Sequence, residues 1–287
     1  MNLIEETKFL MKKYQITANK NYGQNFLVDE NIVNSIVESA KITKDDVVIE
    51  IGPGLGTLTS YLVEKAGKVI CIELDKKMLT ILEERFALYH NFELIHDDIL
   101  KVDLHSLLEE NLKKYPSAKV VANLPYYITT PIIMKLLEEK LNLKSITVMV
   151  QKEMAERLVE KPGGKKCGSI TYGVYYYCTP KLVTAVPNTC FIPSPKVDSS
   201  VIHLELLSSP RVSPLEETLF FQIIKTAFLQ KRKTLLNTLL IGNFGNRDFL
   251  ENMLSTLSID LKIRGEKLSL EQFKAISDYI YEKRNLD

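Results

Sequence analysis

The residues best suited to chemistry stand together in the tetrapeptide Asn123-Leu124-Pro125-Tyr126. It follows an apolar run over 119–122, which predicts a buried strand that ends at the asparagine. The side-chain oxygen of Asn123 and the carbonyl of Leu124 can accept hydrogen bonds from an exocyclic NH2 group, and Tyr126 can stack on its ring. Pro125 fixes its own φ and stiffens the turn. An ordinary strand-to-loop turn has a similar composition, so the neighbouring residues have to decide between the two interpretations.

A second group of residues predicts a nucleotide-type site. Gly52-Pro-Gly-Leu-Gly56 lies between an expected strand and an expected helix, where glycines let the backbone approach a ligand. Glu73 ends the next strand, about 20 residues further on, where a carboxylate can bind both hydroxyls of a ribose. Asp98 follows the third strand and can bond an adenine amine. This order favours S-adenosylmethionine over a dinucleotide, and the Gly-Lys-Ser/Thr loop typical of ATP chemistry is absent from the sequence.

The elements that must position these residues alternate between short apolar runs and helical patterns. Such alternation predicts an α/β fold with a mostly parallel, doubly wound sheet. Three later β-like runs, at 172–178, 181–186 and 201–206, are expected to complete the sheet, with an antiparallel edge as one option. The expected earlier strands are 47–51, 69–72, 92–95, 120–122 and 146–150, and the expected helices include 76–88 and 131–140.

The composition changes at 208–214, a segment rich in Ser and Pro that reads as a linker. Helical periodicity dominates after it. We therefore expect a helix or arm over 1–20, a cofactor-binding domain over 21–207, and a small all-helical domain over 215–287. The arm carries four lysines, namely Lys8, Lys12, Lys13 and Lys20.

Composition narrows the function classes. The 287 residues are 45% hydrophobic with a net charge of +1, so the chain can form a full core and any nucleic-acid surface has to be local. The four cysteines form no Cys-x-x-Cys pair and the four histidines lie apart, which speaks against a metal site. The first residues are acidic where a signal peptide is basic, and no run approaches the ~20 apolar residues of a membrane span. We expect a cytoplasmic monomer with no membrane association.

Six short motifs occur in order along the chain: Tyr22-Gly-Gln-Asn-Phe-Leu27, Glu50-Ile-Gly-Pro-Gly-Leu55, Ile72-Glu-Leu-Asp75, Asn123-Leu-Pro-Tyr126, Gln151-Lys-Glu153 and Phe191-Ile-Pro-Ser-Pro-Lys-Val-Asp-Ser199. Together they resemble the ribosomal RNA adenine N6,N6-dimethyltransferase family. The similarity runs from Lys20 to the C-terminus. The last motif and the helical tail resemble the bacterial enzymes of 16S RNA more than the antibiotic-resistance enzymes of 23S RNA.

The resemblance implies a Rossmann-like S-adenosylmethionine-dependent methyltransferase and a set of site residues. The target adenine would contact Asn123, Leu124 and Tyr126, and Phe191 resembles a second aromatic that packs on the flipped base. For Tyr126 and Phe191, a packed core aromatic is the alternative. The sequence departs from the family at Tyr22, where Phe is frequent, and at Gly168-Ser169, where an arginine commonly follows the glycine. The implied cofactor-binding residues are Asn25, Leu27, Gly52, Gly54, Glu73, Asp98 and Asn123.

The chemistry would need alignment more than a base. The lone pair of adenine N6 is delocalised, whereas the methyl group of a sulfonium is a strong electrophile. Asn123 and Leu124 would accept the two N6 hydrogens and direct the lone pair at the methyl group, and ideal orientation is worth ~7–11 kcal/mol. The target base has to be flipped or unpaired. The resemblance implies dimethylation of two adjacent adenosines near the 3′ end of 16S rRNA during small-subunit biogenesis.

A basic stretch predicts where RNA would bind. Residues 218–247 contain no acid, and four of their basic residues are candidate phosphate contacts: Lys225, Lys231, Arg232 and Lys233. A solvated helix end is the alternative. The loop Lys161-Pro-Gly-Gly-Lys-Lys166 is a second candidate clamp for the RNA backbone.

Other functions stay open at this stage. Methyltransferases of DNA adenine or of protein glutamine use a similar tetrapeptide, but they favour a Pro-Pro core, and this chain has Leu124-Pro125. A 23S rRNA methyltransferase of the antibiotic-resistance type is the nearest enzymatic alternative. A non-enzymatic ribosome-assembly factor is the alternative from another class.

Overall fold

The computed structural model describes residues 2–17, 23–230 and 232–284. They divide into two compact units, one of residues 1–155 with 180–206 and the other of residues 156–179 with 207–287. The predicted arm residue Lys20, the motif residue Tyr22 and the predicted RNA contact Lys231 lie outside the described residues.

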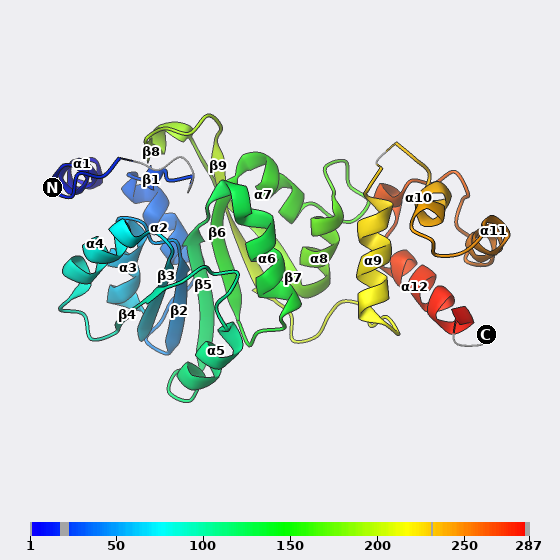
Figure 1. Cartoon of the computed structure of the whole chain (residues 1–287), viewed down its shortest axis with the longest axis horizontal. Helices are drawn as coiled ribbons and strands as arrows, with labels where there is room; N and C mark the ends of the chain where they lie inside the picture. Colours follow the sequence, from blue (N-terminus) through cyan, green and yellow to red (C-terminus); the bar gives the residue numbers. More distant parts are fainter. Residues whose placement is uncertain (1, 18–22, 231, 285–287) are drawn as a thin grey trace. The chain divides into compact units, whose positions relative to one another are not determined.

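A seven-stranded sheet forms the centre of the first unit (Figure 1). Four neighbouring pairs along β4-β3-β2-β5-β6 are parallel, and β9 then pairs antiparallel with β6, from Ser145 opposite Glu205 to Gln151 opposite Ser199. The predicted α/β class with a mostly parallel sheet and an antiparallel strand is therefore confirmed. In sheet order the strands are β4 (Phe92–His96), β3 (Lys68–Glu73), β2 (Asp46–Ile51), β5 (Ser117–Asn123), β6 (Ser145–Gln151), β9 (Ser199–Leu206) and β7 (Cys178–Val186).

Helices cover this sheet because its central strands are apolar on both faces. Every residue of β2 is buried, and the side chains of Val48, Cys71 and Val121 share one core with the first four helices. The N-terminal helix begins at a capping box formed by Asn2 and Glu5. The helices of this unit are α1 (Leu3–Lys13), α2 (Glu30–Ser39), α3 (Thr57–Lys65), α4 (Lys76–Phe86), α5 (Leu104–Leu112) and α6 (Thr129–Glu138). Helix α7 (Lys152–Val159) begins in this unit and ends in the second one.

The second unit is helical and has its own core. The run 172–178 is expected as a strand, but residues 172–177 belong to helix α8 and only Cys178 begins strand β7, so that prediction was wrong. Tyr172 and Tyr176 are one helical turn apart and both fully buried, and Tyr172 donates to the carbonyl of Leu268 at 2.7 Å. Packing of this kind overrides the strand propensity of tyrosine. The helices are α8 (Ser169–Tyr177), α9 (Glu217–Ala227), α10 (Leu235–Ile241), α11 (Arg247–Thr256) and α12 (Leu270–Arg284).

The same aromatic packing explains where the chain divides. Residues 156–179 group with the C-terminal helices, whereas the sequence pattern predicts one domain over 21–207. The ring of Tyr172 packs edge-on against Phe273 at 5.1 Å between centroids, and Tyr176 packs against Phe220 at 5.5 Å. The chain therefore passes between the two units after residues 155 and 179 as well as just before the linker at 208–214.

Candidate active site

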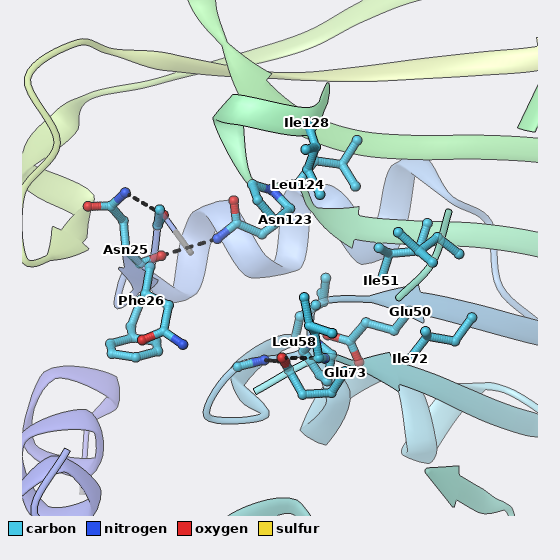
Figure 2. A pocket seen from close by; sticks show the side chains of 18 of the residues that line it. Asn25, Phe26, Glu50, Ile51, Leu58, Ile72, Glu73, Asn123, Leu124 and Ile128 are labelled. Atoms are coloured by element: carbon cyan, nitrogen blue, oxygen red, sulfur yellow. Dashed lines mark hydrogen bonds between the residues drawn. The ribbon is translucent and has the colours of Figure 1, made fainter. Parts of the chain in front are cut away.

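One pocket lies at the carboxyl ends of the parallel strands, where open α/β sheets bind ligands (Figure 2). It encloses about 1040 Å³, counting the part open to solvent. Nine of the ten residues predicted to hold cofactor or adenine line it, namely Asn25, Leu27, Gly52, Gly54, Glu73, Asp98, Asn123, Leu124 and Tyr126. Because the parallel strands end at the same edge of the sheet, residues that lie far apart in the sequence meet in this pocket.

The glycine loop forms the floor between β2 and α3. Gly52, Gly54 and Gly56 all have positive φ, between 58° and 82°. Gly56 also has no room for a side chain, because a Cβ atom there would lie 2.7 Å from the ring of Phe86. Only glycine satisfies both demands, so α4 can pack directly against the loop.

The carboxylate of Glu73 is hydrogen-bonded to this loop. It ends β3, is 7% exposed, and accepts hydrogen bonds from three backbone N–H groups, of Gly54 at 3.2 Å, Leu74 at 2.9 Å and Asp75 at 2.8 Å. Burial raises the pKa of Glu73, while these three donors lower it. The carboxylate is therefore oriented by the backbone, as a group that binds a pair of hydroxyls has to be.

Asn123 ends β5 with its side chain held in one orientation. Its amide nitrogen donates to the carbonyl of Asn25 at 3.3 Å, and the amide oxygen points away from that contact (Figure 2). The N–H of Leu124 donates to Met149 in β6 at 3.1 Å, which aligns the backbone after the strand. The carbonyl of Pro125 accepts from Ile128 and Thr129, so the turn is closed on itself. The turn thus presents an amide oxygen as an acceptor within a rigid backbone.

Tyr126 stands beside these acceptors and is half-buried. Its hydroxyl hydrogen-bonds Ser199 in β9 at 2.6 Å. Burial raises the pKa of this hydroxyl. One end of the side chain is therefore fixed to the sheet, and the residue still lines the pocket.

Asp98 lies on the far wall from Asn123 along the sheet order, after β4. One of its carboxylate oxygens accepts the N–H of Leu100 at 3.0 Å. Its neighbour Asp97 also lines the pocket and accepts the N–H of Asp98 at 2.7 Å. The turn after β4 therefore presents two carboxylates to the pocket.

Phe191 is the predicted residue that the structure does not bring to the pocket. It lies in the short strand β8 (Phe191–Ile192), which pairs with β1 (Phe26–Leu27) and sets Phe191 opposite Leu27. Its side chain is 3% exposed within the core, and it is not among the pocket-lining residues. Packing on a flipped base stays a prediction for this residue. In this structure it supports the strand that carries Leu27.

The predicted RNA contacts lie in the helical unit. Lys225 is exposed on α9, and Arg232 and Lys233 are exposed in the segment that follows it. Their role stays a prediction. Gly168, where the family commonly has an arginine next, begins α8, and its N–H donates to the hydroxyl of Thr171 at 2.9 Å.

Glu50 lines the pocket although the sequence predicts no place for it in the site. This residue lies in β2 just before the loop, lines the pocket and is 2% exposed. Its carboxylate accepts from the hydroxyl of Thr59 at 2.6 Å and from the thiol of Cys71 at 3.3 Å. Burial raises the pKa of Glu50 to about 7. Its position two residues before Gly52 was the available signal.

No three His, Cys, Asp or Glu side chains within residues 2–17, 23–230 and 232–284 are arranged to hold a metal ion. Over the same residues, none of the helices is long and apolar enough to cross a membrane.

The reversed strand β9, the glycine loop and the strand-end carboxylates define a Rossmann-like methyltransferase. The model of the ribosomal RNA adenine dimethylase family matches residues 15–282, and the chain belongs to this family. The resemblance seen in the motifs is thereby confirmed.

Individual relatives agree with this assignment. The chain is 50% identical over 276 residues to ribosomal RNA small subunit methyltransferase A of Clostridium botulinum (strain Kyoto), covering 96% of this chain and 98% of that protein. It is 45% identical over 282 residues to the protein of the same name from Alkaliphilus oremlandii, with 97% of each covered. Among solved structures, a dimethyladenosine transferase from Plasmodium falciparum matches with a TM-score of 0.72 and 28% identity, covering 88% of this chain and 95% of that one. The 23S rRNA methyltransferase ErmE matches with a TM-score of 0.66 at 23% identity, covering 90% and 100%, which shows a shared fold.

Proposed function

We propose that the protein is an S-adenosylmethionine-dependent 16S rRNA (adenine-N6,N6)-dimethyltransferase, acting on two adjacent adenosines near the 3′ end. One observation carries the proposal: the acceptors of Asn123 and Leu124 share a pocket with the glycine loop and Glu73. An amine acceptor next to a nucleotide-type site is what methyl transfer to an adenine requires. The relatives named small subunit methyltransferase A support the choice of 16S rRNA.

The groups that line the pocket fit S-adenosylmethionine. Apolar side chains surround a few polar groups there, as in most small-molecule sites. Glu73 would bind the ribose hydroxyls and Asp98 the adenine amine, and the backbone at Gly52 would approach the cofactor closely because it carries no side chain. When bound, the cofactor supplies an electrophilic methyl group on a sulfonium.

The residues of the chain would act by positioning the target base and its amine. The oxygen of Asn123 and the carbonyl of Leu124 would accept the two N6 hydrogens, and the ring of Tyr126 would stack on the base. Stacking of this kind is worth ~1–3 kcal/mol per base. The hydrogen bond from the Asn123 amide nitrogen to the carbonyl of Asn25, at 3.3 Å, would leave the amide oxygen available to the amine. Because a sulfonium methyl group is a strong electrophile, alignment would matter more than a general base. The proton would leave to solvent after transfer.

The substrate would be the small ribosomal subunit or its precursor in the cytoplasm, bound by a monomer. Lys225, Arg232 and Lys233 would contact phosphates from the helical unit, and Lys231, outside the described residues, would join them. Such contacts release counterions, so RNA binding should weaken steeply with salt.

One experiment tests the proposal. The purified protein is incubated with labelled S-adenosylmethionine and unmethylated small subunits, and the modified nucleotides are mapped. Label on N6 of two adjacent adenosines near the 3′ end of 16S rRNA is the expected result. Label on 23S rRNA would instead support the antibiotic-resistance type of enzyme. Binding of subunits without any cofactor binding would support an assembly factor.

A further inference from the structure

The glycine loop needs support from outside its own sequence. Three glycines with positive φ make a segment with many accessible conformations. The N–H groups of Gly52, Gly54 and Gly56 are bonded within the loop and to β3. The carbonyl of Leu55 is held differently, by a side chain from α4.

That side chain is Arg85, which joins the loop to the N-terminal helix. Its guanidinium donates to the carbonyl of Leu55, to the carboxylate of Glu6 in α1, and to the hydroxyl of Ser60 in α3 at 3.2 Å. The side chains of Arg85 and Glu6 are 15% and 30% exposed, so this charge pair is largely shielded from water. A charge that is partly removed from water depends strongly on the partners that remain.

A second ion pair joins α1 to α4 without touching the loop. Lys13 and Glu84 are 3.1 Å apart, with side chains 48% and 53% exposed. An exposed pair of this kind contributes little. Both Glu84 and Arg85 contact α1, but only Arg85 contacts the loop. Substitutions at these two neighbours therefore distinguish attachment of α1 from support of the loop.

We propose that Arg85 is a positioning residue for the cofactor site, and that Glu6 in α1 holds its guanidinium against the carbonyl of Leu55. The inference rests on the proposed use of S-adenosylmethionine in this pocket. Arg85 would fix the peptide after Leu55, and the N–H of Gly54 would thereby stay within 3.2 Å of the Glu73 carboxylate. Loss of Arg85 should then weaken cofactor binding and change no group assigned to RNA.

The test measures binding of S-adenosylmethionine and S-adenosylhomocysteine to the full-length chain by calorimetry, far below the melting temperature. Arg85→Met should raise Kd about tenfold, as loss of a charged hydrogen bond does. Glu6→Gln should raise Kd about threefold, because a neutral amide holds the guanidinium less firmly. Arg85→Lys should raise Kd by an amount between those for Arg85→Met and Glu6→Gln. Lysine keeps the positive charge, but its ammonium group lacks the planar guanidinium that reaches several acceptors at once. Glu84→Gln is the matched control and should change Kd by less than about twofold.

Steady-state kinetics distinguish positioning from a purely structural role. The KM for the cofactor should rise, while kcat at saturating cofactor and the KM for small subunits stay unchanged. A lower melting temperature with unchanged Kd would overturn the inference, as would equal weakening by Glu84→Gln. If Arg85→Met does not fold, Arg85→Lys and Glu6→Gln decide. If the wild-type chain binds neither compound, the proposed function is overturned. If the wild type binds and the variants bind equally well, only the inference about Arg85 is overturned.

Discussion

The central strand β2 carries a buried carboxylate near each end, and the two differ in their partners and in the direction of their pKa shifts. At its start, Asp46 is 2% exposed and pairs with Lys119 at 2.8 Å, with a further bond from the N–H of Thr43 at 2.7 Å. Near its end, Glu50 is equally buried but accepts only from a hydroxyl and a thiol. The pKa of Asp46 is lowered by its partners against the effect of burial, and burial raises that of Glu50.

The difference between the two carboxylates indicates that one end of the sheet binds ligands and the other stabilises the fold. At the pocket end, neither Glu50 nor Glu73 has a cationic partner among the residues that the structure describes. An unpaired buried carboxylate costs stability, and sites that bind ligands commonly accept such a cost. The ion pair at the other end serves the fold alone. Substitutions at the two ends should therefore affect different measurements.

The largest effect is expected at the structural end. Lys119→Met leaves Asp46 buried without its cation and should lower the free energy of unfolding by about 3–5 kcal/mol. Urea denaturation measures this change, while turnover per folded molecule should stay near wild type. The surface pair of Lys68 and Glu93, at 2.6 Å, provides the control. Lys68→Met should cost less than about 1 kcal/mol, and an equal loss in both variants would contradict the comparison.

Glu50 predicts a pH dependence of the opposite sign to that of Asp46. Its folded pKa of about 7 lies above the usual 4.5, so the folded state holds a proton that the unfolded state has lost. The free energy of unfolding should therefore fall as pH rises between these values and be flat above them. The paired Asp46, with a lowered pKa, contributes stability that is present above its usual pKa and is lost as pH falls through the folded value.

Glu50→Gln tests this sign. Relative to wild type, the variant should gain about 3 kcal/mol of unfolding free energy on going from pH 4 to pH 8, because it has no proton to lose. Urea titrations at several pH values measure the gain. Parallel profiles for the two proteins would show that Glu50 ionises in the folded state as it does in the unfolded chain.

How far the sequence predicts this arrangement depends on whether a feature is local. The tetrapeptide after β5 and the acid Glu73 after β3 follow from strand ends and spacing, and both line the pocket. The pairing of β1 with β8 joins residues about 165 positions apart, and no local pattern signals such a contact. Tyr172 has strand propensity but lies in a helix because the helical core buries it.

At the pocket end, Asn123→Ala should affect catalysis and leave stability nearly unchanged. Loss of one positioned acceptor is expected to lower single-turnover rates ~100-fold, with subunit binding retained. Asn91→Ala is the matched control, because its amide donates to the backbone of Val63 at 2.8 Å and of Ala66 at 3.2 Å, away from the pocket. It should lower the melting temperature and leave the rate unchanged. Near wild-type rates for Asn123→Ala would remove the proposed role of its amide oxygen.

The smallest effect is expected for Glu73→Gln, and it tests the comparison most directly. Loss of the carboxylate should raise the Kd for S-adenosylmethionine about tenfold, since ribose hydroxyls donate more strongly to a charged acceptor. The same change should alter the free energy of unfolding by less than about 1 kcal/mol, because it removes a carboxylate that burial already disfavours. Calorimetry and urea denaturation on one preparation give both numbers. A large loss of stability would mean that Glu73 belongs with Asp46, as a residue that holds the sheet together, and that the two ends of the sheet do not differ in the way their buried acids suggest.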